Sequence, residues 1–143
     1  KGEILSINNS KNLLIEFPMM NLPHNAKNVF DELISAGYNV ILAHPERYYF
    51  VRKDINVLND FVSMGVHLQG NYTSLFGKYG RTSKKILKKL LKRGMIDILA
   101  SDTHHEVIGN EVALRRKLKW YLKEEEINRL LFENFDLIVN NKK

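Results

Sequence analysis

Four side chains that could bind a metal ion occur at three widely separated points of the chain, and they are Glu16, His44 and the pair Asp102 and His104. Carboxylate oxygens and imidazole nitrogens together suit divalent cations such as Mn, Zn or Fe. Because residues i and i+2 of an extended chain point to the same side, Asp102 and His104 are expected to face one metal cluster together. The pattern predicts metal-assisted chemistry, provided that the fold brings the four residues to one place.

The sequence around Glu16 and His44 is typical of strand ends. Glu16 has apolar neighbours on both sides, so its carboxylate is expected to be buried, where it needs a cation, a metal or hydrogen-bond donors. Pro45 directly follows His44 and stops strand pairing, which leaves the imidazole at the point where the strand ends. A single histidine at such a point is as often a hydrogen-bonded structural residue, so the interpretation rests on the set of four.

Alternating apolar runs and helical patterns are the elements that must position these residues. Strands are expected at 13–17, 39–43, 66–69 and 95–100, and helices at 25–36, after a cap at Asp54, after a cap at Thr82 or Ser83, at 111–122 and at 124–134. Repeating strand–helix units of about 30 residues predict a parallel sheet covered by helices. An open α/β sheet and half of a barrel both fit this periodicity.

Functional side chains of parallel α/β folds gather where the strands end. Each expected strand is followed here by polar residues, which would converge on one rim. In chain order the residues are Glu16; His44, Glu46 and Arg47; Gln69, Asn71 and Ser74; and Ser101, Asp102, His104 and His105.

Composition excludes several classes of protein. The 143 residues are 44% hydrophobic and 27% charged, which suits one globular domain over 1–143. No apolar run reaches the roughly 18 residues that cross a bilayer, so membrane insertion is not expected. Cysteine is absent, which excludes disulfides and thiolate nucleophiles and makes the reducing cytoplasm the default location.

The net charge of +6 comes from one segment. Eight cations and no anion lie between Lys78 and Arg93, while the rest of the chain has 14 basic and 16 acidic residues. A nucleic-acid-binding protein usually gathers basic charge from several elements, so this function is not expected. The lysines at 84–92 lie opposite a leucine stripe and are interpreted as a solvated helix face, with electrostatic steering of an acidic phosphopeptide as the alternative.

Four motifs follow one another at the strand ends. They are Leu14-Ile15-Glu16-Phe17-Pro18, Leu42-Ala43-His44-Pro45-Glu46-Arg47-Tyr48, Gln69-Gly70-Asn71-Tyr72-Thr73-Ser74-Leu75-Phe76-Gly77 and Leu99-Ala100-Ser101-Asp102-Thr103-His104. In this order and spacing they resemble the PHP-superfamily protein-tyrosine phosphatases of bacterial capsule and exopolysaccharide synthesis, over about residues 13–141.

The resemblance implies a distorted, TIM-like (β/α)₇ barrel with a cluster of divalent metals, often manganese. It implies hydrolysis of phosphotyrosine on the tail of a bacterial tyrosine kinase. By position, Glu16 resembles a bridging carboxylate, His44 a metal-bound imidazole, and Asp102 and His104 the last ligand pair. Arg47 resembles the arginine that holds the substrate phosphate, with pairing to Glu46 or Asp54 as the alternative. Asn71 is expected to contact substrate or to orient ligands, and loop capping is the alternative.

The family's opening His-x-His strand is not found in the sequence, so the chain resembles the C-terminal portion of a longer protein. A partial barrel would leave strand edges unpaired, which predicts homo-oligomerisation or stabilisation by the missing half. Two other functions stay open at this point. One is a different PHP or amidohydrolase-type metal hydrolase that acts on small phosphoesters or amides, and the other is a non-catalytic interaction protein.

Overall fold

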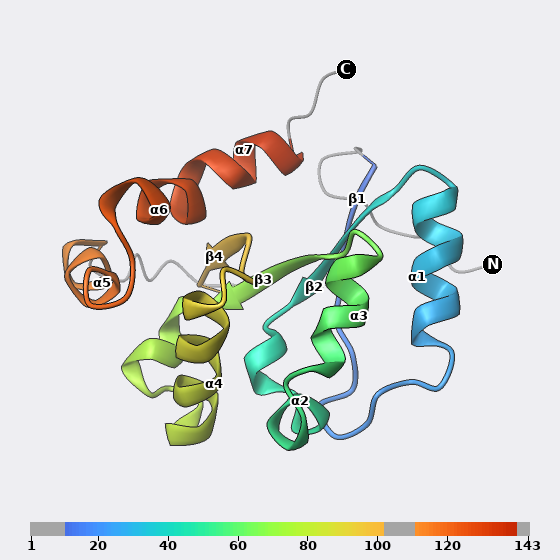
Figure 1. The fold of residues 1–143 in the computed structure, drawn as a ribbon, viewed down its shortest axis with the longest axis horizontal. Coiled ribbons are helices and arrows are strands. Elements are labelled where there is room, and N and C mark those ends of the chain that lie inside the picture. The colour runs from blue at the N-terminus through green and yellow to red at the C-terminus, as the bar shows by residue number, and fades with distance from the viewer. Residues whose placement is uncertain (1–10, 102–110, 140–143) are drawn as a thin grey trace.

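The computed structural model describes residues 11–101 and 111–139, and its centre is a four-stranded parallel sheet (Figure 1). The strands are β1 (Asn12–Ile15), β2 (Asn39–Ala43), β3 (His67–Asn71) and β4 (Ile98–Ala100), and they lie in the order β1-β2-β3-β4. Neighbours in the chain are therefore neighbours in the sheet. This confirms the expected parallel α/β fold.

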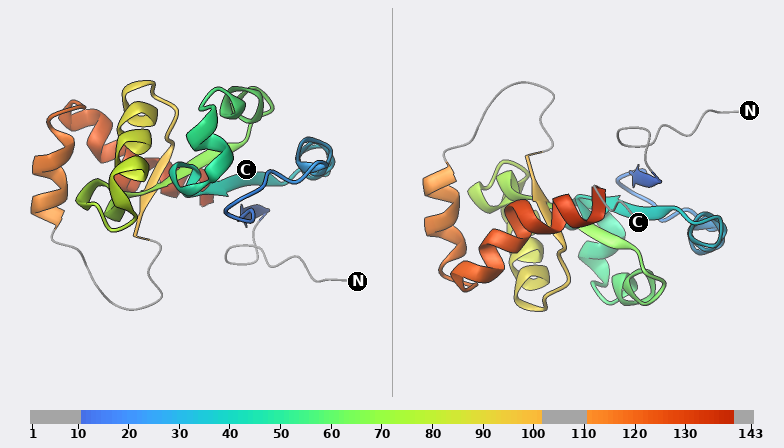
Figure 2. Two further views of the ribbon diagram at one scale, coloured as in Figure 1. Left: turned by 90° about the horizontal axis from the view of Figure 1, so that it is seen from below. Right: turned by 90° about the horizontal axis from the view of Figure 1, so that it is seen from above.

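Helices connect and cover the strands. They are α1 (Ala26–Ser35), α2 (Tyr49–Lys53), α3 (Val57–Ser63), α4 (Gly80–Lys92), α5 (Glu111–Leu118), α6 (Glu124–Asn128) and α7 (Asn134–Val139), with short 3₁₀ turns η2 (Pro45–Arg47) and η3 (Tyr72–Phe76) and a π-helical turn η4 (Arg129–Glu133). Figure 2 shows α1, α3 and α4 following one another along the curved sheet, with α6 and α7 extending across the region of β4.

The register of the strands aligns the positions at which they end. Ala43 of β2 lies beside Gln69 of β3, and Asn71 of β3 lies beside Ala100 of β4. Residues that follow these positions therefore leave the sheet at one rim. Because β1 also runs parallel to β2, with Ile15 beside Leu42, Glu16 comes to the same rim.

Aromatic side chains fill the core under the first two strands. Phe17 stacks on Phe30 with the ring centroids 5.4 Å apart, and Phe61 meets Phe30 edge-on at 5.1 Å. Tyr48 packs beside Phe17 and is fully buried.

Helix α4 approaches the sheet closely at Gly70. A Cβ atom at this position would lie 2.7 Å from Cδ1 of Leu87 and 3.2 Å from Cδ2 of Leu99. A larger residue here would force the leucine side chains to shift, including the stripe of α4 whose buried members are Leu87, Leu90 and Leu91.

Some element ends differ from the sequence-based expectation. Helix α4 begins at Gly80, so neither Thr82 nor Ser83 caps it, and the buried hydroxyl of Ser83 accepts a hydrogen bond from Arg52 instead. Helix α3 begins at Val57, and Asp54 accepts the N–H of Asn56 in the turn before the helix. Strand β4 is shorter than expected. The last expected helix continues through η4 into α7.

None of the helices in the described part of the chain is long and apolar enough to cross a membrane.

Candidate active site

Glu16 and His44 meet at the rim where β1 and β2 end. Oε1 of Glu16 lies 3.0 Å from Nε2 of His44, and the imidazole is buried. The expectation that Glu16 is buried was wrong, because 58% of its side chain is exposed. β1 is an edge strand of the described sheet, and the carboxylate follows its last residue, so solvent reaches it from the open side.

The backbone holds His44 in an unusual conformation. Its φ of 36° lies in the left-handed region, which residues with a Cβ atom seldom adopt. The N–H of His44 donates to the carbonyl of Gln69 at 2.7 Å, and its own carbonyl accepts the N–H of Arg47 at 2.9 Å. These bonds fix the sharp change of direction from β2 into η2. Such conformations cluster at functional sites.

The two facing side chains suit one divalent cation. Oε1 of Glu16 and Nε2 of His44 face each other at 3.0 Å, and a carboxylate oxygen with an imidazole nitrogen forms a donor pair that such an ion accepts. Among residues 11–101 and 111–139 no group of three His, Asp or Glu side chains could hold a metal ion. The other expected ligands, Asp102 and His104, lie outside the described residues, as does His105.

A buried hydrogen bond ties the two ligand-bearing segments together. The backbone N–H of Phe17 donates to the phenol oxygen of Tyr48 at 3.0 Å. Burial is the main cause that raises the pKa of this phenol well above its usual value, so Tyr48 stays neutral. Phe17 follows Glu16 directly, and Tyr48 ends the turn that begins at His44, so this bond fixes one ligand segment against the other.

Behind the rim lies a buried carboxyl group, that of Glu46. Its Oε1 accepts the hydroxyl of Ser74 at 2.8 Å and the N–H of Asn71 at 3.2 Å. Its Oε2 is buried and has no hydrogen-bond partner among the described residues. Burial raises the pKa of Glu46 to about 7, against the hydrogen bond from Ser74 and the charge of Arg47, which lower it.

Asn71 connects this carboxyl group to Arg47 through Tyr79. The side-chain oxygen of Asn71 accepts the N–H and the hydroxyl of Thr73, at 2.9 and 2.7 Å, and so caps η3. Its Nδ2 donates to the phenol oxygen of Tyr79 at 3.5 Å. The guanidinium carbon of Arg47 lies 4.2 Å from the centre of the Tyr79 ring. The stacked ring fixes the plane in which Arg47 presents its N–H groups.

Arg47, three residues after His44 in the sequence, lines a cleft of about 260 Å³. Its lining residues are Met19, Met20, Arg47, Tyr49, Arg52 and Tyr79. Two guanidinium groups and no carboxylate line this cleft, together with aromatic and thioether side chains. Such a cleft suits an anion that is attached to an aromatic ring.

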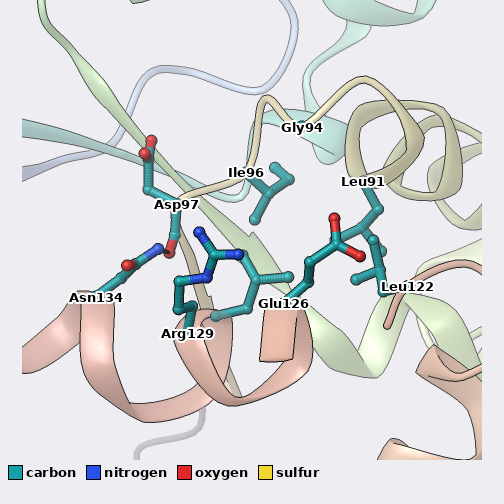
Figure 3. Close-up of a pocket in the computed structure, with 9 residues that line it drawn as sticks. Leu91, Gly94, Ile96, Asp97, Leu122, Glu126, Arg129 and Asn134 are labelled. Atoms are coloured by element: carbon teal, nitrogen blue, oxygen red, sulfur yellow. Dashed lines mark hydrogen bonds between the residues drawn. The ribbon is translucent and has the colours of Figure 1, made fainter. Parts of the chain in front are cut away.

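A second cavity, of about 230 Å³, lies at the opposite end of the sheet (Figure 3). It is bordered by Asp97, which precedes β4, and by residues of α6, η4 and α7. Asn134 donates to the carbonyl of Asp97 at 2.8 Å and joins α7 to the start of β4. The cavity is therefore far along the strands from the rim at which Glu16 and His44 meet.

Sequence patterns did not predict that four of the residues would line this cleft. They are Met19, Met20, Arg52 and Tyr79. Tyr79 follows a glycine-containing turn, and its partner Arg47 comes from a different strand end, so no local spacing links them. The exposed Tyr49 also lines the cleft.

The chain was compared with known families and proteins. Residues 1–140 match the family model described as capsular polysaccharide synthesis, CpsB/CapC. The chain is 32% identical to tyrosine-protein phosphatase YwqE of Bacillus subtilis over 146 residues, which cover 99% of this chain and 56% of that protein. It has the same identity and coverage with the putative tyrosine-protein phosphatase CapC of Staphylococcus aureus.

Similarity extends to a solved structure. A chain from the crystal structures of YwqE from Bacillus subtilis and CpsB from Streptococcus pneumoniae, described as unique metal-dependent tyrosine phosphatases, superposes with a TM-score of 0.83 at 32% identity. The match covers 97% of this chain and 57% of that one. This chain thus spans little more than half the length of the curated relatives it matches.

Proposed function

Because the chain belongs to the CpsB/CapC family of capsular polysaccharide synthesis, we propose that it forms the C-terminal part of a metal-dependent protein-tyrosine phosphatase. The observation that carries this proposal is the meeting of Glu16 with His44 at 3.0 Å, at the rim that also presents Arg47. Its substrate would be phosphotyrosine on the tail of a bacterial tyrosine kinase that regulates capsule or exopolysaccharide synthesis.

Glu16 and His44 are proposed to hold a divalent metal together with Asp102 and His104. Manganese is the first candidate, because oxygen and imidazole ligands both suit it, with zinc and iron as the alternatives. A metal at this site would supply the Lewis acid that activates water for hydrolysis of a phosphate monoester. The hydrogen bonds of its N–H and carbonyl fix the backbone of His44, and burial holds its imidazole at the rim.

Arg47 is proposed to hold the substrate phosphate. A guanidinium presents parallel N–H donors that fit two phosphate oxygens, and stacking on Tyr79 holds it in one plane. Arg52 lines the same cleft and adds a second positive charge. Asn71 would then act on substrate indirectly, since its side chain caps η3 and donates to Tyr79.

The aromatic part of the substrate would lie along Met19, Met20 and Tyr49, which line the cleft of Arg47. Aromatic and thioether side chains are suitable neighbours for a phenyl ring. Tyrosinate is a good leaving group, so the reaction does not depend on a strong general acid. None of these 143 residues is a cysteine, so none of them supplies a thiolate, and the nucleophile of the proposed reaction is water.

The parallel βα units are proposed to complete a distorted, TIM-like (β/α)₇ PHP barrel with the remainder of the full-length protein. β1 and β4 are the outer strands of the described sheet, and both carry edges that further strands could pair with. The active protein is thus the full-length chain.

The proposal is tested by assaying the full-length protein on a phosphotyrosine peptide and on a matched phosphoserine peptide. We expect release of phosphate from the phosphotyrosine peptide in the presence of Mn²⁺, loss of activity with a chelator, and recovery on adding metal. The same peptide carrying phosphoserine should react poorly, because no ring fills the cleft. Failure of every divalent metal tried to support hydrolysis of phosphotyrosine would refute the proposal.

A further inference from the structure

A further groove, separate from the cleft of Arg47 and from the cavity beside Asp97, borders the segment that follows β3. The proposed reaction does not use it. Its volume is about 290 Å³. Its lining residues are Phe76, Ala113, Arg116, Lys117, Trp120 and Tyr121. We call these residues the aromatic–basic groove. Its residues come from two regions that are distant in the sequence, namely η3 and α5 with the turn that follows α5.

Large aromatic surfaces in this groove face solvent. Trp120 is 82% exposed, although tryptophan is among the side chains that gain most from burial, and Phe76 is 48% exposed. Exposed aromatic residues that gather in one place mark interaction sites more often than single exposed ones do. Trp and Arg are also the residue types that contribute most to binding energy in protein interfaces.

Cations surround the aromatic rings. Nζ of Lys117 lies 4.5 Å from the centre of the Phe76 ring. Lys88 and Lys92, from the outward face of α4, lie 5.1 and 5.7 Å from the ring of Tyr121. These two lysines of α4 thus lie over Tyr121, which lines the groove, and add positive charge at its border.

No carboxylate lines the groove, and the acidic residues nearby in the described part of the chain are paired elsewhere. Glu111 binds Arg115 at 2.8 Å, and Glu124 binds both Arg115 at 2.9 Å and Lys119 at 3.0 Å. The groove thus presents Arg116 and Lys117 as positive charges that no lining residue offsets. An occupant with negative charge would complement it.

The position of the groove relates it to the proposed phosphate cleft. Phe76 ends η3 and lines the groove, while Tyr79, three residues later, lines the cleft and stacks on Arg47. One short segment thus borders both. A peptide bound in the cleft by its phosphotyrosine could therefore continue into the groove.

We propose that the aromatic–basic groove docks an acidic segment of the phosphotyrosine-bearing peptide, outside the residue that is hydrolysed. This rests on the proposed phosphatase function. Carboxylates of the peptide pair with Arg116 and Lys117, and an apolar or aromatic side chain packs on Trp120. A peptide is favoured over a lipid surface because the rings and cations line a hollow rather than a flat or protruding face.

The test uses the full-length enzyme with Mn²⁺ and three substrates: p-nitrophenyl phosphate, a phosphotyrosine peptide with an acidic flank, and one with a neutral flank. The variants are Trp120→Ala and Arg116→Gln, and the matched control is Arg129→Gln, an exposed arginine outside the groove. We expect each groove variant to raise KM for the acidic peptide by about fivefold, an effect that salt weakens. In the groove variants, KM for p-nitrophenyl phosphate and for the neutral peptide should not change. In Arg129→Gln, KM should not change for any of the three substrates.

Binding is measured separately from catalysis through the emission of Trp120, the single tryptophan of this chain. Titration with the unphosphorylated acidic peptide should change the emission in a saturable way, and Arg116→Gln, which keeps the tryptophan, should weaken the change. This readout remains valid if the enzyme hydrolyses none of the substrates, which would refute the phosphatase function alone. Unchanged KM for the acidic peptide in both groove variants, or emission that responds to phosphatidylserine vesicles but not to peptide, would overturn the docking proposal.

Discussion

The backbone N–H of Phe17 donates a hydrogen bond to the phenol oxygen of Tyr48, 31 residues later in the chain. This contact joins the end of β1 to the turn after β2, and the two segments carry Glu16 and His44. The two side chains lie 3.0 Å apart. A buried tyrosine thus joins the two segments that carry the proposed ligands.

Replacing Tyr48 by Phe is expected to lower the free energy of unfolding by about 1–3 kcal/mol, because the buried N–H of Phe17 loses its acceptor. Urea denaturation of the full-length protein measures this change. Tyr49→Phe is the matched control, since Tyr49 is exposed and should leave stability within about 0.5 kcal/mol of the parent. Equal stability of Tyr48→Phe and the parent would show that this bond does not hold the two segments.

Glu46 is expected to make stability depend on pH. Its pKa is about 7 in the folded protein, against a usual value of 4.5, so folding favours the protonated form. The stabilisation is complete below about pH 4.5 and is lost as the pH rises through 7, at up to about 1.4 kcal/mol per pH unit. Glu46→Gln keeps an acceptor for Ser74 and should flatten this dependence. Chelator-treated protein is used for urea denaturation between pH 5 and 8, a range chosen to span the transition. If the free energy of unfolding depends on pH in the same way in Glu46→Gln and in the parent protein, Glu46 is not the source of this dependence.

Loss of either proposed ligand should reduce both metal content and activity. His44→Asn is the informative change, because asparagine tolerates the left-handed backbone and only the imidazole is lost. We expect Glu16→Gln and His44→Asn to lower phosphatase activity of the full-length protein at least about 100-fold, with metal content measured by elemental analysis. Glu32→Gln, an exposed residue of α1, serves as the control. Full metal content and activity in His44→Asn would remove this residue from the site.

A lysine at position 47 is not expected to replace Arg47 in binding the substrate phosphate. Lysine cannot donate two parallel hydrogen bonds to phosphate or stack as a plane on Tyr79, so Arg47→Lys should raise KM for a phosphotyrosine peptide by about tenfold or more. Tyr79→Leu should produce a smaller rise, and Tyr79→Phe should retain most of the affinity because the ring remains. The exposed Arg93→Lys is the control. If steady-state kinetics give Arg47→Lys the same KM as the parent protein, Arg47 does not bind the substrate phosphate.

The close approach of α4 to the sheet predicts a destabilising effect of a single methyl group. Gly70→Ala places Cβ 2.7 Å from Leu87, and the overpacking should cost about 1–3 kcal/mol. Leu87→Ala alone should cost about 2–5 kcal/mol by creating a cavity. The double variant should lose less than the sum of the two, because the new methyl group occupies space that the leucine leaves. Additive losses in thermal or urea unfolding would show that the two positions do not compete for the same space.

Local patterns in the sequence predicted the sheet well. The apolar runs before Pro18, His44-Pro45 and Gln69 correspond to β1, β2 and β3, because strands buried between helices need continuous apolar sequence. Helix starts were less predictable. Thr82 and Ser83 are good capping residues, but α4 begins earlier because Ser83 is buried against Arg52. Tertiary contact here outweighs the local preference.

Part of the site could be predicted in the same way. Glu16 and His44 were expected to meet, because parallel strands bring their ends to one rim, and the structure places them together. The exposure of Glu16 could not be predicted, since local sequence does not reveal which strand lies at an edge. The stacking of Tyr79 on Arg47 depends on how two loops cross, and no periodicity encodes that.

The left-handed backbone at His44 has a consequence for how the chain can evolve. Glycine would adopt the same φ without steric cost, but it would empty the space that the buried imidazole fills beside Tyr48. Relief of the backbone and loss of packing therefore oppose each other at this position. A screen for heat resistance alone has no simple route away from histidine here, so the imidazole aimed at Glu16 should persist in it.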